Sequence, residues 1–170
     1  YFRMTGDEDF LKDVYPAIAK GARWIDSMRM SDVPKDDPRF GLLPPGISAE
    51  HFGTSDCYYW DDLWAVGGLK AASLAASSLG LTSDARYTDG LAAEIMSDMR
   101  ASWSAAAGRL GRDVIPISPF RDLDAGSIGI LAAVYPLDII DPREPVMENT
   151  VSELVERCFY RDTHYHGIMH

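Results

Sequence analysis

Residues 87–103, YTDGLAAEIMSDMRASW, carry the clearest structural pattern in the chain. Apolar side chains recur there at every fourth position, namely Tyr87, Leu91, Ile95, Met99 and Trp103. Glu94, Asp98 and Arg100 fall away from that stripe. This spacing predicts an α-helix with one buried face, because positions four apart lie one turn above another. We expect the helix to end at Gly108.

A second helix is predicted just before it, from about Trp60 to Leu79, with Gly80 as its stop signal. Its body is rich in small residues, which are Ala65, Gly67, Gly68, Ala71, Ala72, Ala75 and Ala76. Glycine inside a helix costs roughly 1 kcal/mol relative to alanine. The glycine pair therefore indicates close approach of a neighbouring helix rather than added stability. After Gly80, Thr82 or Ser83 can cap the next helix.

Further helices are predicted on both sides of this pair. Residues 5–8, TGDE, fit a capping box led by Thr5. Pro16 suits a first helical position, and this helix is expected to end near Met30. Asp124 can cap a short helix, and a last helix follows Pro145. Strand-like alternation is nearly absent, so the sequence predicts an all-α fold of about five helices in antiparallel-hairpin order.

Composition limits the classes of partner. The 170 residues are 46% apolar with a formal net charge of −10, which suits one domain with a core. The charge argues against nucleic acid and anionic membranes as partners. The least polar stretch, residues 63–81, contains Lys70 and several serines, so it predicts a buried helix rather than a membrane span. Cys57 and Cys158 are expected to be buried free thiols.

Residues 31–59 show no sustained periodicity and contain many prolines and glycines. Such a long irregular stretch in a compact domain is usually functional. Its densest part continues into the second helix, and residues 41–64 read GLLPPGISAEHFGTSDCYYWDDLW. Carboxylates and aromatic rings are mixed there, as sugar binding requires, because sugar C–H faces pack on rings while hydroxyls need placed acceptors. Glycosidic hydrolysis further needs two carboxyl groups with opposed protonation.

Several segments resemble one enzyme superfamily. They are Thr5-Gly6-Asp7, Phe10-Leu11, Tyr15-Pro16, Gly21-Ala22, Trp24-Ile25, Gly41-Leu42-Leu43-Pro44, Glu50-His51, Tyr58-Tyr59-Trp60-Asp61-Asp62 and, more weakly, the closing residues 165–170. Together they resemble the six-hairpin glycosidases, the (α/α)6-toroid glycoside hydrolases. The resemblance implies a ring of six inner and six outer helices, with sugar bound where the inner-helix loops converge. It also implies one carboxyl group as general acid and a second as base, commonly with inversion.

Four carboxylates are candidate catalytic residues. Glu50 is the candidate acid, because aromatic neighbours could desolvate it and raise its pKa; an exposed loop carboxylate is the alternative. Asp56 is a candidate base or hydroxyl-binding group, and an Asx-turn is its alternative. Asp61 and Asp62 are also candidates, although negative charge at a helix start is favourable in any protein. Successive helix positions diverge by about 100°, so both should not face one substrate atom.

The candidate substrate-binding residues are His51, Tyr58, Tyr59, Trp60, Trp64 and His166. The aromatic members could form a sugar platform, and core packing explains Trp64 equally well. Two other kinds of site have some support in the sequence. Asp61-Asp62 resembles the start of a Mg²⁺-diphosphate motif, but position 65 is alanine where a further carboxylate is needed. His164, His166 and His170 have metal-ligand spacing without an interleaved acid or cysteine. We therefore expect neither a metal nor a cofactor.

The expected organisation is a single helical domain over residues 1–170 that forms part of a larger catalytic toroid. Twelve helices at roughly 10–14 residues each, with long loops, need well over three hundred residues. The expected ligand is an oligo- or polysaccharide. An apolar flank on the helix from Trp60 to Leu79 is expected to lack its neighbours and to promote self-association. The alternative is a non-catalytic helical binding or scaffolding domain, in which the acids and aromatics are caps and packing.

Overall fold

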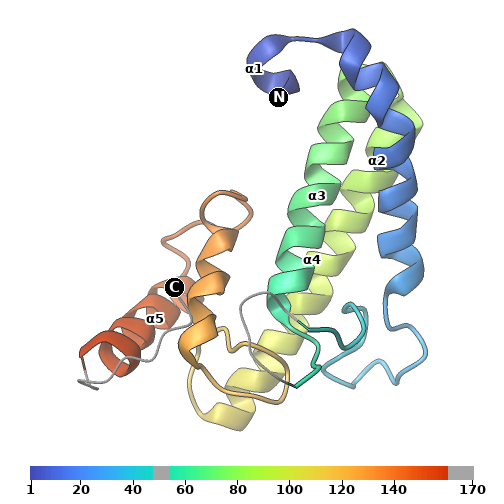
Figure 1. Ribbon diagram of the computed structural model, residues 1–170. Coiled ribbons are helices and arrows are strands. Elements are labelled where there is room, and N and C mark those ends of the chain that lie inside the picture. The colour runs from blue at the N-terminus through green and yellow to red at the C-terminus, as the bar shows by residue number, and fades with distance from the viewer. Residues whose placement is uncertain (48–53, 161–170) are drawn as a thin grey trace.

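The computed structural model of the protein describes residues 1–47 and 54–160. Regular secondary structure in these two ranges is helical, apart from one isolated antiparallel bridge between Gly46 and Asp56. The predicted all-α fold is therefore confirmed. Three long helices, α2 (Glu8–Met28), α3 (Tyr59–Ser78) and α4 (Thr82–Leu110), run side by side, and the elements that follow α4 gather toward one end (Figure 1). The toroidal arrangement stays a prediction.

The short α1 (Phe2–Thr5) leads into α2 through Gly6. Helix α2 begins at Glu8 because the Asp7 carboxylate accepts the Phe10 N–H at 3.0 Å. Asp7, not Thr5, is thus the cap. The prediction that Pro16 stands at a first helical position is wrong, since Pro16 is an exposed interior residue of α2. The buried stripe of α2 consists of Leu11, Tyr15, Ala19 and Ala22.

Helices α3 and α4 form the central hairpin. Gly80, whose φ is +72°, turns the chain between them. Leu63, Val66 and Leu69 of α3 are fully buried in the same core as four residues of the predicted α4 stripe, which are Leu91, Ile95, Met99 and Trp103. The prediction that Gly108 ends α4 is wrong, because the helix continues through it to Leu110 and stops at Gly111, whose φ is +67°. A single helical glycine costs only about 1 kcal/mol, which packing can offset.

A buried segment without regular secondary structure, residues 114–119, follows α4 and joins the elements at this end of the molecule. The Ile117 carbonyl accepts the Tyr59 N–H at the start of α3, at 3.1 Å. The Ile115 N–H donates to Thr150 Oγ1 at 2.9 Å. Thr150 belongs to α5 (Pro145–Leu154), which starts at the predicted proline. The segment therefore holds the start of α3 and the body of α5 in fixed positions.

The remaining elements complete this end. Asp124 caps the 3₁₀ helix η1 (Ala125–Ala133) in a reciprocal capping box with Ser127, so the predicted cap is confirmed. The π-helical turn η2 (Val155–Tyr160) follows α5. Cys57 is a buried free thiol, whereas the side chain of Cys158 lies outside the described part of the chain. Within the described ranges, no helix is both long and apolar enough to cross a bilayer.

Candidate functional site

The backbone on both sides of residues 48–53 is fixed by one bridge. The Gly46 N–H donates to the Asp56 carbonyl at 3.0 Å, and the Asp56 N–H donates to the Gly46 carbonyl at 3.1 Å. The bridge brings Pro44–Gly46 against the entry to α3. Glu50 and His51, the predicted acid and one predicted sugar contact, lie outside the described residues, as does His166.

Asp56 is held through both carboxylate oxygens. Its Oδ1 accepts the Cys57 N–H at 2.8 Å, and its Oδ2 accepts the Ser118 hydroxyl at 2.7 Å. Ser118 is fully buried and comes from the segment after α4, 62 positions along the chain. Two hydrogen bonds from different elements fix the orientation of this half-buried carboxylate. Sequence reasoning missed Ser118, whose one signal is a lone hydroxyl within the apolar run 114–119.

Asp61 lies beside the same bridge. A Cβ built on Gly46 would lie 3.9 Å from Asp61 Oδ2, an ordinary van der Waals distance, so Gly46 and the Asp61 carboxylate are neighbours. Asp61 is half-buried in the first turn of α3, where negative charge is favourable. The bridge thus places two predicted catalytic residues, Asp56 and Asp61, around one glycine.

Asp62 does not lie beside Gly46 with Asp56 and Asp61. It is 1% exposed, and its Oδ1 accepts the Leu43 N–H at 2.8 Å, while its Oδ2 has no hydrogen-bond partner among the described residues. Burial raises the pKa of Asp62 to about 8, and Asp61 raises it further, whereas the Leu43 hydrogen bond and Arg29 lower it. Asp62 is therefore mostly a neutral acid at pH 7. Its buried position is not that of a substrate-facing group, which corrects the prediction made for it.

The aromatic residues of this segment divide into two pairs. Tyr58 and Tyr59 are buried, so the structure corrects their prediction as an exposed sugar platform. The Tyr58 hydroxyl donates to the Thr54 carbonyl at 2.6 Å and accepts from Arg121 at 2.9 Å. Tyr59 lies edge-on to Trp103, with ring centroids 6.0 Å apart, and its hydroxyl lies 2.6 Å from that of Ser102. Burial raises the pKa of Tyr59 well above its usual range.

Trp60 and Trp64 are more exposed than the two tyrosines. Trp60 is partly exposed and Trp64 is 41% exposed, and their rings meet edge to face with centroids 5.3 Å apart. Of the predicted aromatic contacts in the described residues, these two are the ones a ligand can reach. The two rings lie on the same side of α3, because positions 60 and 64 lie one turn apart.

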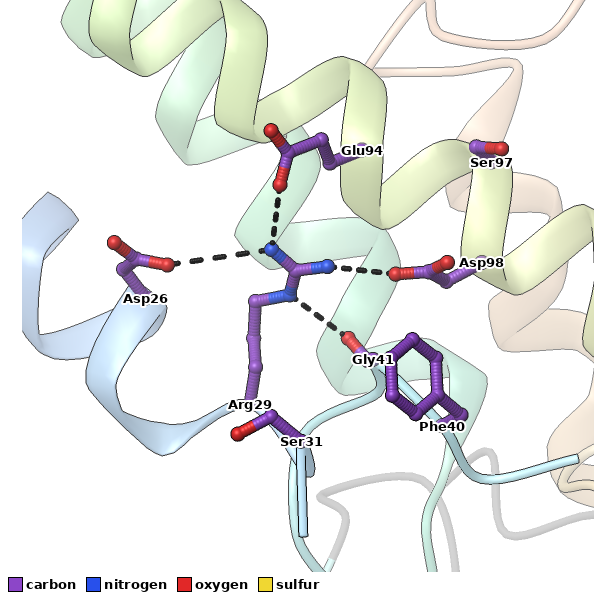
Figure 2. Close-up of a pocket in the computed structure, with 8 residues that line it drawn as sticks. All are labelled: Asp26, Arg29, Ser31, Phe40, Gly41, Glu94, Ser97 and Asp98. Carbon is purple, nitrogen blue, oxygen red and sulfur yellow. Dashed lines mark hydrogen bonds and ion pairs between the residues drawn. The ribbon is translucent and has the colours of Figure 1, made fainter. Parts of the chain in front are cut away.

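A second polar cluster surrounds Arg29, at the end of α2 (Figure 2). Its guanidinium donates to Glu94 at 3.0 Å, to Asp98 at 2.6 Å and to the Gly41 carbonyl at 3.1 Å. Asp26 stands 4.0 Å away on a third side. A pocket of about 420 Å³ adjoins the cluster.

The arrangement of the Arg29 cluster is structural. The Arg29 side chain is only 13% exposed, and its donors are directed at partners in α4 and in the loop after α2. Gly41 has a φ of +74°, and a Cβ there would overlap the Asp98 carboxylate. The cluster therefore ties α2, α4 and the loop together. The described residues contain no group of three or more His, Cys, Asp or Glu side chains arranged to hold a metal ion.

Comparisons of this chain with protein families, with curated proteins and with solved structures find no match. A function for the chain therefore has to be inferred from the geometry and chemistry of its own residues.

Proposed function

We propose that this chain is the carbohydrate-binding part of a glycoside hydrolase, with Asp56 and Asp61 as its carboxylate groups and Trp60 and Trp64 as its sugar-contacting surface. The observation that carries the proposal is the position of Asp56 and Asp61 at the Gly46–Asp56 bridge, with the partly exposed Trp60 next to Asp61 in the sequence. Carboxylates beside an exposed aromatic surface are the groups that sugar recognition and glycosidic hydrolysis require.

Asp56 suits the role of base or hydroxyl acceptor. Hydrogen bonds from Cys57 and Ser118 hold both of its oxygens, and catalysis depends on such fixed orientation. Asp61 suits contact with a sugar hydroxyl, because it is only half-buried and lies beside Gly46. The general acid remains predicted at Glu50. Hydrolysis by Glu50 and its partner carboxylate would invert the anomeric configuration if the two carboxyl groups lie roughly 6.5–9.5 Å apart. It would retain the configuration if they lie about 5–5.5 Å apart.

Hydrolysis and binding of an oligosaccharide panel test this proposal. We expect Asp56→Asn to lower hydrolysis by about 100-fold or more while sugar binding survives, because a positioned acid or base contributes roughly 10²–10⁴-fold. Glu50→Gln should act in the same way. Asp113→Asn is the matched control, since Asp113 is exposed and lies after α4, away from the bridge. A panel that is neither bound nor cleaved would contradict the proposal.

The alternative function is that of a non-catalytic binding or scaffolding domain. The observation that favours it is the exposed side of α3, where Trp64, Ala71 and Leu74 are all solvent-accessible. Exposed apolar surface of this kind is typical of protein–protein contacts. Light scattering separates the two proposals. Self-association that Leu74→Glu abolishes, together with an absence of sugar binding, would favour the scaffolding function.

A further inference from the structure

An open groove lies along α3, next to Trp64. Its volume is about 560 Å³. Trp64, Gly68 and Lys70 contribute from α3, Leu137 and Asp138 lie opposite, and Arg3 of α1 completes it. Figure 1 shows α1 and the segment after η1 on the same side of α3. We call this surface the Trp64 groove.

The floor of the Trp64 groove has few side chains. A Cβ built on Gly68 would meet nothing within 4 Å, so the helix backbone there is open to a ligand. Gly67, the residue before it, accommodates the Leu137 side chain, which closes the opposite wall. A flat floor beside an indole ring fits a sugar ring, because its C–H face can pack on the indole and its edge can reach the backbone.

The charge of the groove is opposite to that of the chain. Arg3 and Lys70 form no ion pair with any described residue, while Asp138 is the carboxylate that lines the groove with them. The groove is therefore net positive on a chain whose formal charge is −10. Cations without protein partners beside an aromatic ring are available to a ligand carboxylate.

The groove and the candidate site both involve helix α3. Trp64 meets Trp60 edge to face, and Trp60 precedes Asp61 at the start of α3. An extended ligand that runs from the groove along α3 toward its first turn would approach the carboxylates beside Gly46. A neutral sugar leaves the two cations unused, and an acidic peptide does not account for the bare helix floor.

We infer that the Trp64 groove binds a carboxylated saccharide, a chain that contains uronic acid residues, with Trp64 against a sugar ring and Arg3 and Lys70 on its carboxylates. The inference rests on the proposed function, since it names the class of substrate for that site. Asp138 then accepts a sugar hydroxyl. The groove selects the acidic chain, and the carboxylates at Gly46 act on it.

Binding measurements on the 170-residue chain test the inference. The probes are tetrasaccharides of galacturonate, glucuronate or mannuronate and their methyl esters, which match them in size without the charge. We expect at least one acid form to bind more tightly than its ester. Lys70→Gln and Arg3→Gln should each weaken binding of the acid by about threefold to tenfold and leave the ester unaffected. Raising the ionic strength from about 0.01 to about 1 M should weaken binding of the acid form only, because the screening length shortens from roughly 30 to 3 Å.

Two charge-removing variants outside the groove serve as matched controls. Lys20→Gln and Arg86→Gln remove exposed charges from α2 and α4 outside the groove and should change nothing. Trp64→Ala should weaken binding of the acid form and of the ester to the same extent. Equal affinity for acid and ester, or no effect of the two groove variants, would overturn the inference. Poly-glutamate that binds as tightly as the uronate would also overturn it, because the site would then recognise charge without a sugar.

Failure of the inference and failure of the proposed function give different results. A uronate that binds in the groove but is never cleaved supports the inference about the groove and contradicts the catalytic proposal. Cleavage of neutral oligosaccharides without preference for the acid form supports the catalytic proposal and contradicts the groove.

Discussion

The two sides of α3 are made from similar residues and have opposite roles. On one side Leu63, Val66 and Leu69 are fully buried against α4. On the other side Trp64 and Gly68 line an open groove. Both sides are apolar, so hydrophobicity alone does not separate core from ligand surface. The neighbouring elements decide it, because α4 covers one side whereas the segment after η1 covers the other only in part.

The largest difference between the two sides should appear in stability. Leu63→Ala removes a fully buried side chain and should lower the free energy of unfolding by about 2–5 kcal/mol. Trp64→Ala, one position along, should cost only about 1 kcal/mol, because Trp64 is 41% exposed. Urea unfolding followed by far-ultraviolet circular dichroism measures both. Equal losses would mean that the outer side of α3 is also part of the core.

The buried side also contains Asp62, which should make stability depend on pH. Burial raises the pKa of Asp62 in the folded state from 3.8 to about 8. Between these values the folded state keeps a proton that the unfolded state loses, so ionisation favours unfolding. The Asp62 contribution to stability is therefore complete below about pH 4 and is lost as pH rises toward 8. The free energy of unfolding then falls by up to about 1.4 kcal/mol per pH unit through this group.

Asp62→Asn tests this linkage, because the amide cannot ionise. Urea unfolding from pH 5 to pH 9 should show a falling stability in the native sequence and a flatter profile in the variant. Asp113→Asn, at an exposed position, should keep the native slope. A variant profile as steep as the native one would assign the effect to another group.

The smallest expected effect comes from the adjacent glycines. Gly68→Ala adds a methyl group into open space and should stabilise the protein by about 0.5–1 kcal/mol through helix propensity. Gly67→Ala should gain less or lose stability, because its Cβ would lie 2.6 Å from a Leu137 methyl carbon that must then move. Thermal unfolding of the two variants side by side measures the difference. If Gly67→Ala is the more stable variant, Leu137 does not close the groove.

The sequence predicts the helices well where one face is distinctly apolar. Leu91, Ile95, Met99 and Trp103 are buried as their spacing indicates, although Tyr87 of the same stripe is 39% exposed. The predicted helix at 60–79 agrees with α3 to within a residue at each end. Helix ends are harder to predict, because a cap depends on local geometry. Gly111 ends α4 since it takes the left-handed conformation there, which Gly108 inside the helix does not.

The candidate site is only partly predictable. The apolar residues of α3 are spread around the helix, so its sequence does not reveal which of two adjacent aspartates faces the core, and Asp62 rather than Asp61 is buried. The hydrogen bond from Ser118 to Asp56 joins residues 62 positions apart, and no local pattern encodes such a contact. The same holds for the groove, since Arg3, Lys70 and Asp138 come together only when α1 and the segment after η1 pack near α3.

The Gly46–Asp56 bridge has a consequence for how such a chain can diversify. Its two hydrogen bonds join Gly46 to Asp56 and so fix the distance between the two ends of the intervening stretch, residues 47–55. Doubling the length of a flexible insertion between fixed ends costs only about 0.6 kcal/mol in closure entropy. That stretch can therefore be exchanged or lengthened while Asp56 and the first turn of α3 stay where they are. It is a natural place to graft new sequence, and so to alter selectivity by design or by descent.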